Sequence, residues 1–566
     1  MAIYDAPATW ELEADFVCIG SGIGGLAGAI TAHEHGLSSL VLEKSSLVGG
    51  VTAYSFGEVW APANHLQAAA GIADSPESGL RYVEWLSMGF GDARLIRNYL
   101  VHAPIVLKYF EERAAVRWAI IPDFSDYYWP QQEDAVREGR FIEVEPFPAA
   151  TLGEWQERTR TTPHAPYGLT HHDMFGQGGA ANIANWDFSL LGERLEKDER
   201  CLGPGLAASF VKAALDRGIP LVTDTDVLGL VIDQGRVIGV RAVQDGRVVH
   251  VRAARGVLIA AGAYDGNPAL DRLFEHRHGL ESAVPSSVTG DSLKLAGAAG
   301  AKIGLVPTPD FLGYHIPGEE QDGRPLWRAA MLECGFPHTM VVNRAGRRFG
   351  DESFYRSIGM ATPLIEGGDQ TQPNFPCWLI LDSQYQQKYP LGSLLPRQDY
   401  PEGLATSADT IEELAERIGV EPAGLADEVA KFNLYAETGV DLEHHRGEKA
   451  WSQYLCGDRA HQPNPNLGTI AQGPFYAIAQ QRLGTGMVAA GVVADVHSRA
   501  LGYDDEPIAG LYVAGNAMAR LDNGAGYQSG MMNGRGMVNG YLAARDAAGD
   551  ASTALDASEL STAALP

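Results

Sequence analysis

A glycine-rich turn between two apolar runs constrains this chain most. An apolar run at residues 15–19 leads into Gly20-Ser21-Gly22-Ile23-Gly24-Gly25, a helix-like stretch follows, and a second apolar run occupies residues 39–43. This spacing is typical of a dinucleotide-binding βαβ unit. Gly20 permits the tight turn, Gly22 lets backbone N–H groups approach a pyrophosphate, and Gly25 lets the helix pack closely on the strand. The positive end of that helix favours the negative charge.

Glu43, at the end of the second run, indicates which dinucleotide the site binds. It is placed to accept hydrogen bonds from a ribose and would repel a 2′-phosphate, which favours NAD or FAD over NADP. Residues 44–52 follow directly and contain Gly49-Gly50, whose backbone could follow a long dinucleotide toward an isoalloxazine. An ordinary glycine turn is the alternative interpretation of this doublet. The sequence predicts FAD, bound noncovalently because no attachment site is evident.

Length, charge and cysteine spacing limit the remaining classes. A chain of 566 residues is expected to form more than one domain. Its net charge of −28 disfavours a nucleic acid or an anionic membrane as partner. The five cysteines show no CxxC spacing, which argues against a metal site or attached haem. With no basic leader and no apolar run of about 18 residues, we expect a cytoplasmic protein without a membrane span.

The order of the remaining patterns predicts the domain organisation. Runs at residues 228–232, 237–243 and 250–254 predict a β-meander, and residues 256–262 predict a buried strand beside the cofactor. Between residues 285 and 454 the sequence predicts short elements of mixed type, with many prolines and charged residues. We therefore expect an α/β fold, with a Rossmann-like FAD-binding domain (parallel sheet plus β-meander) interrupted by an inserted α+β catalytic domain. The predicted boundaries are 1–284, 285–454 and 455–548, with a disordered tail at 549–566.

Three shorter stretches have less distinctive patterns. Residues 56–62 are interpreted as a polar and aromatic turn, and His171-His172 as a loop pair without metal-ligand spacing. Four aromatic rings stand between Pro122 and Pro130, two of them at Tyr127 and Tyr128. They could be packing filler, or they could line a pocket for an apolar ligand.

Together these motifs resemble the flavoprotein family that includes fumarate reductases and 3-ketosteroid dehydrogenases, with greater similarity to the latter. The resemblance covers nearly the whole chain, in residues 20–25, 43–52, 126–128, 203–206, 260–266, 289–291, 347–355, 446–448, 473–476 and 510–536. It implies an FAD domain interrupted by a catalytic domain that closes over the isoalloxazine.

The motifs that distinguish the branches are mixed. Tyr527-Gln528-Ser529 is similar to enzymes that introduce a 4,5 double bond into 5α-3-ketosteroids, whereas Asp126-Tyr127-Tyr128 resembles the 1,2-dehydrogenases. The ring system therefore stays open, and a smaller cyclic ketone such as a cyclohexanone is an alternative. Arg356 directly follows Tyr355, close to where fumarate reductases have a proton-donating arginine, so a slip of one residue exchanges the two interpretations.

The resemblance implies roles for individual residues. Desaturation beside a carbonyl removes a proton from the α carbon and a hydride from the β carbon, and flavin N5 takes the hydride. Tyr355 is expected to be the base, with Tyr127 or Tyr128 relaying the proton. Tyr527, oriented by Ser529, and the N–H groups around Gly530 and Met531 are expected to bind the carbonyl oxygen. A tyrosine base needs its pKa lowered from about 10, which we expect from nearby hydroxyls, the cofactor and an oriented helix start.

The cofactor and its partners complete the prediction. Asn516 stands where many FAD enzymes place an acid on the ribityl chain, and its amide can make the same hydrogen bond. The predicted FAD contacts come from Gly20, Ser21, Gly22, Gly24, Gly25, Glu43, Lys44, Gly49, Gly50, Thr52, Val227, Ala261, Gly262, Gly515, Asn516 and Met532. The expected partners are an apolar cyclic ketone and an external electron acceptor such as a quinone, an electron carrier or oxygen. A fumarate-type reductase of a carboxylated alkene and a noncatalytic flavin-binding redox sensor are the alternative functions.

Overall fold

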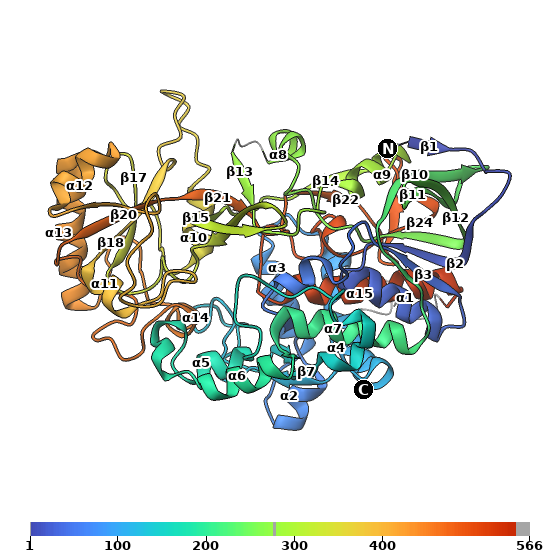
Figure 1. The fold of residues 1–566 in the computed structure, drawn as a ribbon, viewed down its shortest axis with the longest axis horizontal. Coiled ribbons are helices and arrows are strands. Elements are labelled where there is room, and N and C mark those ends of the chain that lie inside the picture. The colour runs from blue at the N-terminus through green and yellow to red at the C-terminus, as the bar shows by residue number, and fades with distance from the viewer. Residues whose placement is uncertain (1, 276–278, 551–566) are drawn as a thin grey trace.

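The computed structural model describes residues 2–275 and 279–550. Figure 1 shows an elongated molecule with the largest sheet near one end of its long axis and strands β17, β18 and β20 near the other. The predicted disordered tail lies outside the described residues from 551 onward. No described helix is long and apolar enough to cross a membrane.

Nine of the described strands form the largest sheet, which confirms the predicted parallel sheet and β-meander. The parallel part runs in the order β9 (Leu221–Val222), β3 (Ser39–Leu42), β2 (Leu12–Ile19), β12 (Arg247–Ile259) and β24 (Pro507–Val513). The antiparallel part is β10 (Thr225–Asp233), β11 (Arg236–Gln244) and β12, with β1 (Ala2–Tyr4) and β23 (Arg499–Leu501) added at the margins. The two runs predicted at 250–254 and 256–262 are one strand, β12, with a register shift between Ala253 and Gly256.

Helices α1 (Ile23–Glu34) and α15 (Met531–Ala548) pack against this sheet. Behind them, α7 (Leu202–Asp216) packs on α1, α4 (Ala93–Ala114) on α15 and α3 (Pro76–Leu86) on α4. Figure 1 shows α1 and α15 beside each other next to the strands. Their close approach requires glycine, because a Cβ at Gly540 of α15 would lie 2.4 Å from the carbonyl oxygen of Gly24 in α1. The helices predicted after the glycine turn and near the C-terminus are confirmed.

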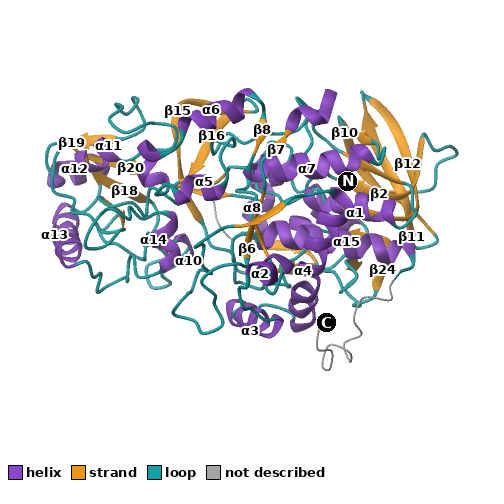
Figure 2. Cartoon of the chain, turned by 90° about the horizontal axis from the view of Figure 1, so that it is seen from below, coloured by secondary structure: helices purple, strands orange, loops and turns teal. Residues whose placement is uncertain are grey.

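Two smaller sheets occupy the inserted part. One pairs β13 (Leu280–Ser282), β21 (Gln481–Gly484), β15 (Phe311–Gln321) and β16 (Arg324–Ala329); the other pairs β17 (Thr339–Asn343), β18 (Cys377–Asp382), β20 (Phe475–Ala479) and β19 (Thr406–Ala408). Helices α10 (Tyr355–Ala361), α11 (Ser383–Lys388), α12 (Ile411–Ile418), α13 (Pro422–Thr438) and α14 (Ala450–Leu455) accompany them, and Figure 2 shows α12 and α13 at the outer end. Since β20 and β21 follow residue 454, strands on both sides of that predicted boundary share these sheets.

The other α-helices and strands are short. The strands are β4 (Val59–Trp60), β5 (Trp118–Ile120), β6 (Phe141–Val144), β7 (Phe147–Pro148), β8 (Glu199–Arg200), β14 (Ile303–Leu305) and β22 (Ala490–Val492). The helices are α2 (His65–Ala70), α5 (His171–Gly176), α6 (Phe188–Glu196), α8 (Pro268–Phe274) and α9 (Asp291–Ala298).

Two sequence interpretations in this region are wrong. The stretch 56–62 is not only a turn, because Val59 and Trp60 pair with Ile142 and Phe141. His171-His172 is not a loop pair but the start of α5. Thr170 caps this helix and forms a reciprocal capping box with Asp173, which satisfies the first N–H groups of the helix.

Candidate active site

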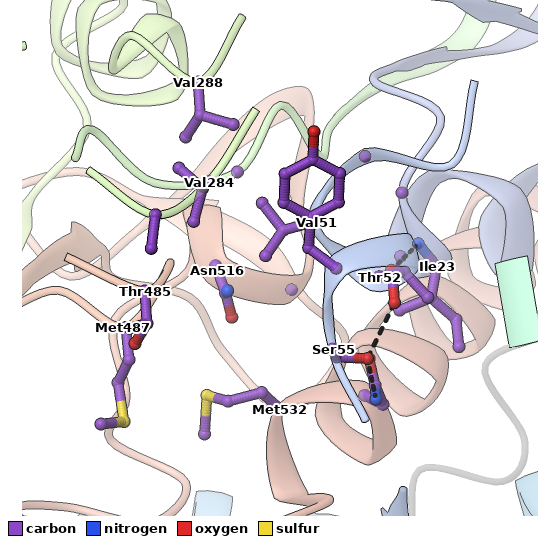
Figure 3. Close-up of a pocket in the computed structure, with 18 of the residues that line it drawn as sticks. Ile23, Val51, Thr52, Ser55, Val284, Val288, Thr485, Met487, Asn516 and Met532 are labelled. Carbon is purple, nitrogen blue, oxygen red and sulfur yellow. Dashed lines mark hydrogen bonds between the residues drawn. The ribbon is translucent and has the colours of Figure 1, made fainter. Parts of the chain in front are cut away.

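A cavity of about 410 Å³ lies where the large sheet meets the inserted part. Its wall includes the glycine turn after β2, the stretch after Gly50, the turn that follows β12, the start of α15 and Tyr355 of α10. Figure 3 shows Val51, Val284, Val288, Met487 and Met532 as apolar parts of the wall, with Asn516 and Thr485 among them.

The glycine turn has the geometry that its spacing predicts. Gly20 has a φ of +104°, and a Cβ at Gly25 would lie 1.9 Å from the carbonyl oxygen of Gly20. A Cβ at Gly22, in contrast, would meet only Thr52 Oγ1, at 3.9 Å. A Cβ at Gly262 or Gly515 would likewise meet a single atom, at 3.9 Å, and both glycines have positive φ. We call these three glycines the glycine cradle. Their backbone is accessible to a ligand, and side chains at these positions would occupy the space that the ligand needs.

Glu43 and Lys44 hold this cradle together. One Glu43 oxygen accepts hydrogen bonds from Ser21 N (3.0 Å) and Ser21 Oγ (2.6 Å), and the other accepts one from Ser45 N. Ser21 Oγ in turn accepts from the N–H of Gly49 (3.1 Å), which joins the two glycine segments. Lys44 Nζ lies 3.0 Å from Asp291 and donates to Thr289, both in the predicted 289–291 motif.

Most of the predicted cofactor residues meet at this cavity. Its lining includes Gly20, Ser21, Gly22, Gly24, Glu43, Lys44, Gly50, Thr52, Val227, Ala261, Gly262, Gly515, Asn516 and Met532. Gly25 and Gly49 lie behind the wall and permit its packing. Figure 3 shows Thr52 accepting the N–H of Ile23 at the first turn of α1 (3.0 Å). The open glycine backbone, the helix start and the long apolar wall fit FAD.

Three tyrosines converge on the other side of the cavity. The hydroxyl oxygens of Tyr127 and Tyr355 are 3.1 Å apart, and the ring of Tyr527 lies 6.2 Å and 6.4 Å from theirs. Trp451 packs against Tyr127 and Phe311 stacks on Tyr355. All three tyrosines line the cavity.

Tyr128 and Met531 have different positions. Tyr128 contacts Trp85 and Phe354, outside the cavity lining, so of the two possible relays only Tyr127 lies beside Tyr355. Gly530, with a φ of +82°, precedes α15 and lines the cavity. The N–H of Met531 donates to the carbonyl of Gln528 (3.2 Å), so it is engaged within the turn.

Buried ion pairs fix the position of Tyr355. Arg348 donates two hydrogen bonds to Glu352, both 2.7 Å, and a third to Asp441. Arg446 lies 3.4 Å from Glu352, and all four side chains are fully or almost fully buried. The 347–355 motif is therefore locked to the 446–448 motif, and Tyr355 begins α10 three residues after Glu352.

The protein's own groups change the tyrosine pKa values in the direction opposite to that expected. Burial, together with Tyr127 and Tyr527, raises the pKa of Tyr355 well above its ordinary value, although Arg356 opposes this. Burial and the neighbouring Tyr527 likewise raise the pKa of Tyr127. Burial and Glu58 raise the pKa of Tyr527 to about 12. Desolvation outweighs the stabilisation of a phenolate by neighbouring hydroxyls.

The arginine of the alternative interpretation lies elsewhere. Arg356 is buried, donates to the carbonyl of Ala525 (2.9 Å) and is not part of the cavity lining. Within the described part of the chain, the basic side chains of the lining are Lys44, His164 and Arg328. Lys44 pairs with Asp291 and Arg328 with Glu319, at 3.0 Å and 2.7 Å.

Sequence reasoning missed Glu58. This buried carboxyl lines the cavity, accepts a hydrogen bond from Ser529 Oγ, and lies 3.3 Å from His171 Nε2. Burial raises its pKa to about 7, although the hydrogen bond from Ser529 lowers it. The signal that the sequence offered for this residue was the position of Glu58 between Gly57 and the apolar pair Val59-Trp60.

Comparison with known proteins identifies the family. The chain is 31% identical to a 3-oxosteroid 1-dehydrogenase of Mycolicibacterium smegmatis, over 95% of this chain and 98% of that one. It is 32% identical to a 4-oxocyclohexanecarboxylate 2-dehydrogenase of Sinomonas cyclohexanicum, over 98% and 97% of the two chains. The crystal structure of a 3-ketosteroid Δ1-dehydrogenase from Sterolibacterium denitrificans, in complex with 1,4-androstadiene-3,17-dione, has a TM-score of 0.87 at 29% identity, covering 95% of this chain and 99% of that one.

A family model described as "FAD binding domain" matches residues 15–532, which span nearly all of the described chain. This match confirms the FAD-binding fold that the glycine turn predicts. The chain therefore belongs to the FAD-binding domain family and, with the dehydrogenases similar to it over their full length, is an FAD-dependent oxidoreductase acting on CH–CH groups.

Proposed function

We propose that this enzyme introduces a carbon–carbon double bond next to the carbonyl of a cyclic ketone, either a 3-ketosteroid or a smaller ring. The observation that supports this most is the Tyr127–Tyr355 hydroxyl pair, which faces a largely apolar cavity together with Tyr527. A neutral ring ketone suits such a wall. The names of the two relatives also contain ring ketones, a 3-oxosteroid and 4-oxocyclohexanecarboxylate, of which the second carries a carboxylate as well.

Each tyrosine has a separate role in this proposal. Tyr355 Oη accepts the proton from the α carbon, and Tyr127 Oη, 3.1 Å away, takes up the hydroxyl proton that Tyr355 gives up. Tyr527 donates a hydrogen bond to the ketone oxygen as negative charge develops there, with the N–H of Gly530 as a second donor. The glycine cradle would hold FAD noncovalently, and the bound flavin would supply the hydride acceptor, with an external acceptor for its electrons.

The roles of Tyr355 and Arg356 can be tested with a pair of neighbouring substitutions. Tyr355→Phe should keep FAD and ligand binding but slow flavin reduction by roughly a hundredfold or more, the usual effect of removing a general base. Arg356→Lys should change the rate far less, because Arg356 lies outside the cavity lining. Stopped-flow measurement of flavin reduction compares the two variants. Loss of turnover in Arg356→Lys with a near-normal Tyr355→Phe would instead favour a carboxylate-alkene reductase.

A further inference from the structure

A buried carboxyl lies within reach of the tyrosine cluster and has no role in the function proposed above. Glu58 stands just before β4, its side chain is 5% exposed, and it lines the same cavity as Tyr127, Tyr355 and Tyr527. Resting on the proposed function, we propose that Glu58 is the final acceptor of the substrate's α-proton, which reaches it from Tyr355 through Tyr127 and Ser529.

Hydroxyl groups line the cavity between Tyr355 and Glu58. Tyr355 Oη and Tyr127 Oη are 3.1 Å apart. At the other end, Ser529 Oγ donates to Glu58 Oε2. Ser529 lines the cavity together with Tyr127 and Tyr527, and it lowers the pKa of each of these tyrosines against the larger effect of burial. Two hydrogen-bonded pairs of oxygens therefore face the same cavity, and proton transfer from Tyr127 to Ser529 is the step that joins them in this proposal.

The surroundings of Glu58 differ from those of a carboxyl in a buried ion pair. Asn533 of α15 donates to its backbone carbonyl (2.9 Å), and His171 of α5 lies 3.3 Å from Oε1. Burial lowers the pKa of His171 to about 3, so the imidazole is neutral. Tyr454 of α14 faces the same space, as does Glu143 of β6, whose pKa burial raises to about 8. In the described part of the chain Glu58 thus has no cationic partner, unlike Glu352 with Arg348.

This environment suits a proton acceptor. Burial raises the pKa of Tyr127, Tyr355 and Tyr527, so none of these three readily remains a phenolate after the reaction. A carboxyl with a pKa of about 7 is ionised in part at neutral pH and can take the proton.

The step balances in protons and electrons. The α C–H bond breaks and its proton bonds to Tyr355 Oη, while the Tyr355 proton moves to Tyr127, the Tyr127 proton to Ser529 and the Ser529 proton to Glu58 Oε2. The electron pair of that bond enters the new double bond as the β hydride leaves for FAD. Tyr355, Tyr127 and Ser529 end the step in the protonation states in which they began it, and Glu58 ends it as a neutral acid.

The test uses the FAD-loaded enzyme and a ring ketone that reduces it. Glu58→Gln keeps the shape and removes the acceptor, Glu58→Asp restores a carboxyl, and Ser529→Ala breaks the chain one link earlier. Glu275→Gln is the matched control, because Glu275 is a buried glutamate that accepts from a tyrosine hydroxyl (Tyr264, 2.6 Å) outside the cavity lining. FAD affinity is measured first for every variant.

Two readouts decide the outcome. In the wild type and in Glu275→Gln, the rate of flavin reduction should fall as pH drops through about 7, because the acceptor must be ionised. Glu58→Gln should be slower by about tenfold to a hundredfold and lose this inflection, and Glu58→Asp should recover part of the rate. The infrared difference spectrum on reduction should gain the carbonyl band of a protonated carboxylic acid in the wild type but not in Glu58→Gln.

Other outcomes are equally informative. An unchanged inflection and an unchanged carboxylic acid band in Glu58→Gln would overturn the relay while leaving the proposed function intact. Failure of the wild type to be reduced by any ring ketone would refute the proposed function itself. If Glu58→Gln does not bind FAD, Ser529→Ala decides: a slowed enzyme without the band supports the relay, and normal kinetics with the band contradicts it.

Discussion

Glu58 and Glu352 show, at the scale of single residues, two ways in which this protein holds a buried carboxyl. Arg348 and Arg446 surround Glu352, and although burial opposes them they lower its pKa. Glu58 has Ser529 as its partner, and burial raises its pKa from 4.5 to about 7. At pH values between 4.5 and about 7, the folded protein therefore binds more protons at Glu58 than the unfolded chain does. The stability that Glu58 contributes therefore decreases as pH rises through this window.

A stability measurement follows from this sign. Glu58→Gln should raise the free energy of unfolding relative to the wild type, by up to about 3 kcal/mol above pH 7 and by little below pH 4.5. Urea unfolding of the FAD-loaded proteins at about pH 5 and about pH 8.5 measures the difference. A difference that is equal at both pH values, or larger at the lower one, would show that Glu58 does not carry the buried charge.

Glu58 could not be predicted from the sequence for a physical reason. Its partner Ser529 lies 471 residues away along the chain. A glutamate in a glycine-containing turn is usually solvated. The contact of His171 with Glu58 likewise joins distant parts of the chain, although the cap at Thr170 that begins its helix is a local signal. Tyr127, Tyr355 and Tyr527 line one cavity, an arrangement that the family resemblance implies and periodicity does not, and their catalytic roles stay a prediction.

The arrangement of individual elements depends on the two neighbouring arginines Arg347 and Arg348. Arg348 is fully buried between Glu352 and Asp441, whereas Arg347 is half exposed and pairs with Asp427 on the surface. The buried pairs connect the segment before α10 to the segment before α14, and so hold Tyr355 in place.

This contrast gives a matched pair of substitutions. Arg348→Met should destabilise the protein by about 3–5 kcal/mol, because it leaves the buried Asp441 without its cation and Glu352 with Arg446 alone. Arg347→Met should change the stability by less than about 1 kcal/mol, because its pair with Asp427 is exposed and its second partner, the buried Glu428, keeps Lys431 at 3.3 Å. Denaturant unfolding compares both variants with the wild type. Similar effects of the two substitutions would contradict the assignment of the anchor to Arg348.

Elements defined by local patterns were predictable from the sequence, and those defined by distant pairing were not. The glycine turn, the β10–β11–β12 meander and helix α15 follow from short-range periodicity and glycine placement. The pairing of β18 with β20 joins residues about a hundred positions apart, and no local signal specifies it. The domain boundary predicted at residue 454 also depends on such distant pairings, because strands on both sides of it share sheets. That boundary stays a prediction.

In the molecule as a whole, the cavity lies between the large-sheet region and the inserted part. Glycines of the large-sheet region form one wall, and Phe311, Met331 and Tyr355 of the inserted part contribute to the other. The chain carries a net charge of −28, and two of the basic side chains at the cavity, Lys44 and Arg328, are paired with carboxylates. Both features disfavour a dicarboxylate and favour a neutral ring as the substrate.

Anaerobic reduction of the bound flavin tests this account most directly. The FAD-loaded enzyme is mixed without oxygen with cyclohexanone, a 5α-3-ketosteroid, a 4-ene-3-ketosteroid and succinate in turn, and the visible flavin absorbance is followed. At least one of the ring ketones should bleach the flavin rapidly, Tyr355→Phe should slow that bleaching by roughly a hundredfold, and succinate should leave the spectrum unchanged. Bleaching by succinate, with none by any ring ketone, would contradict the proposed function.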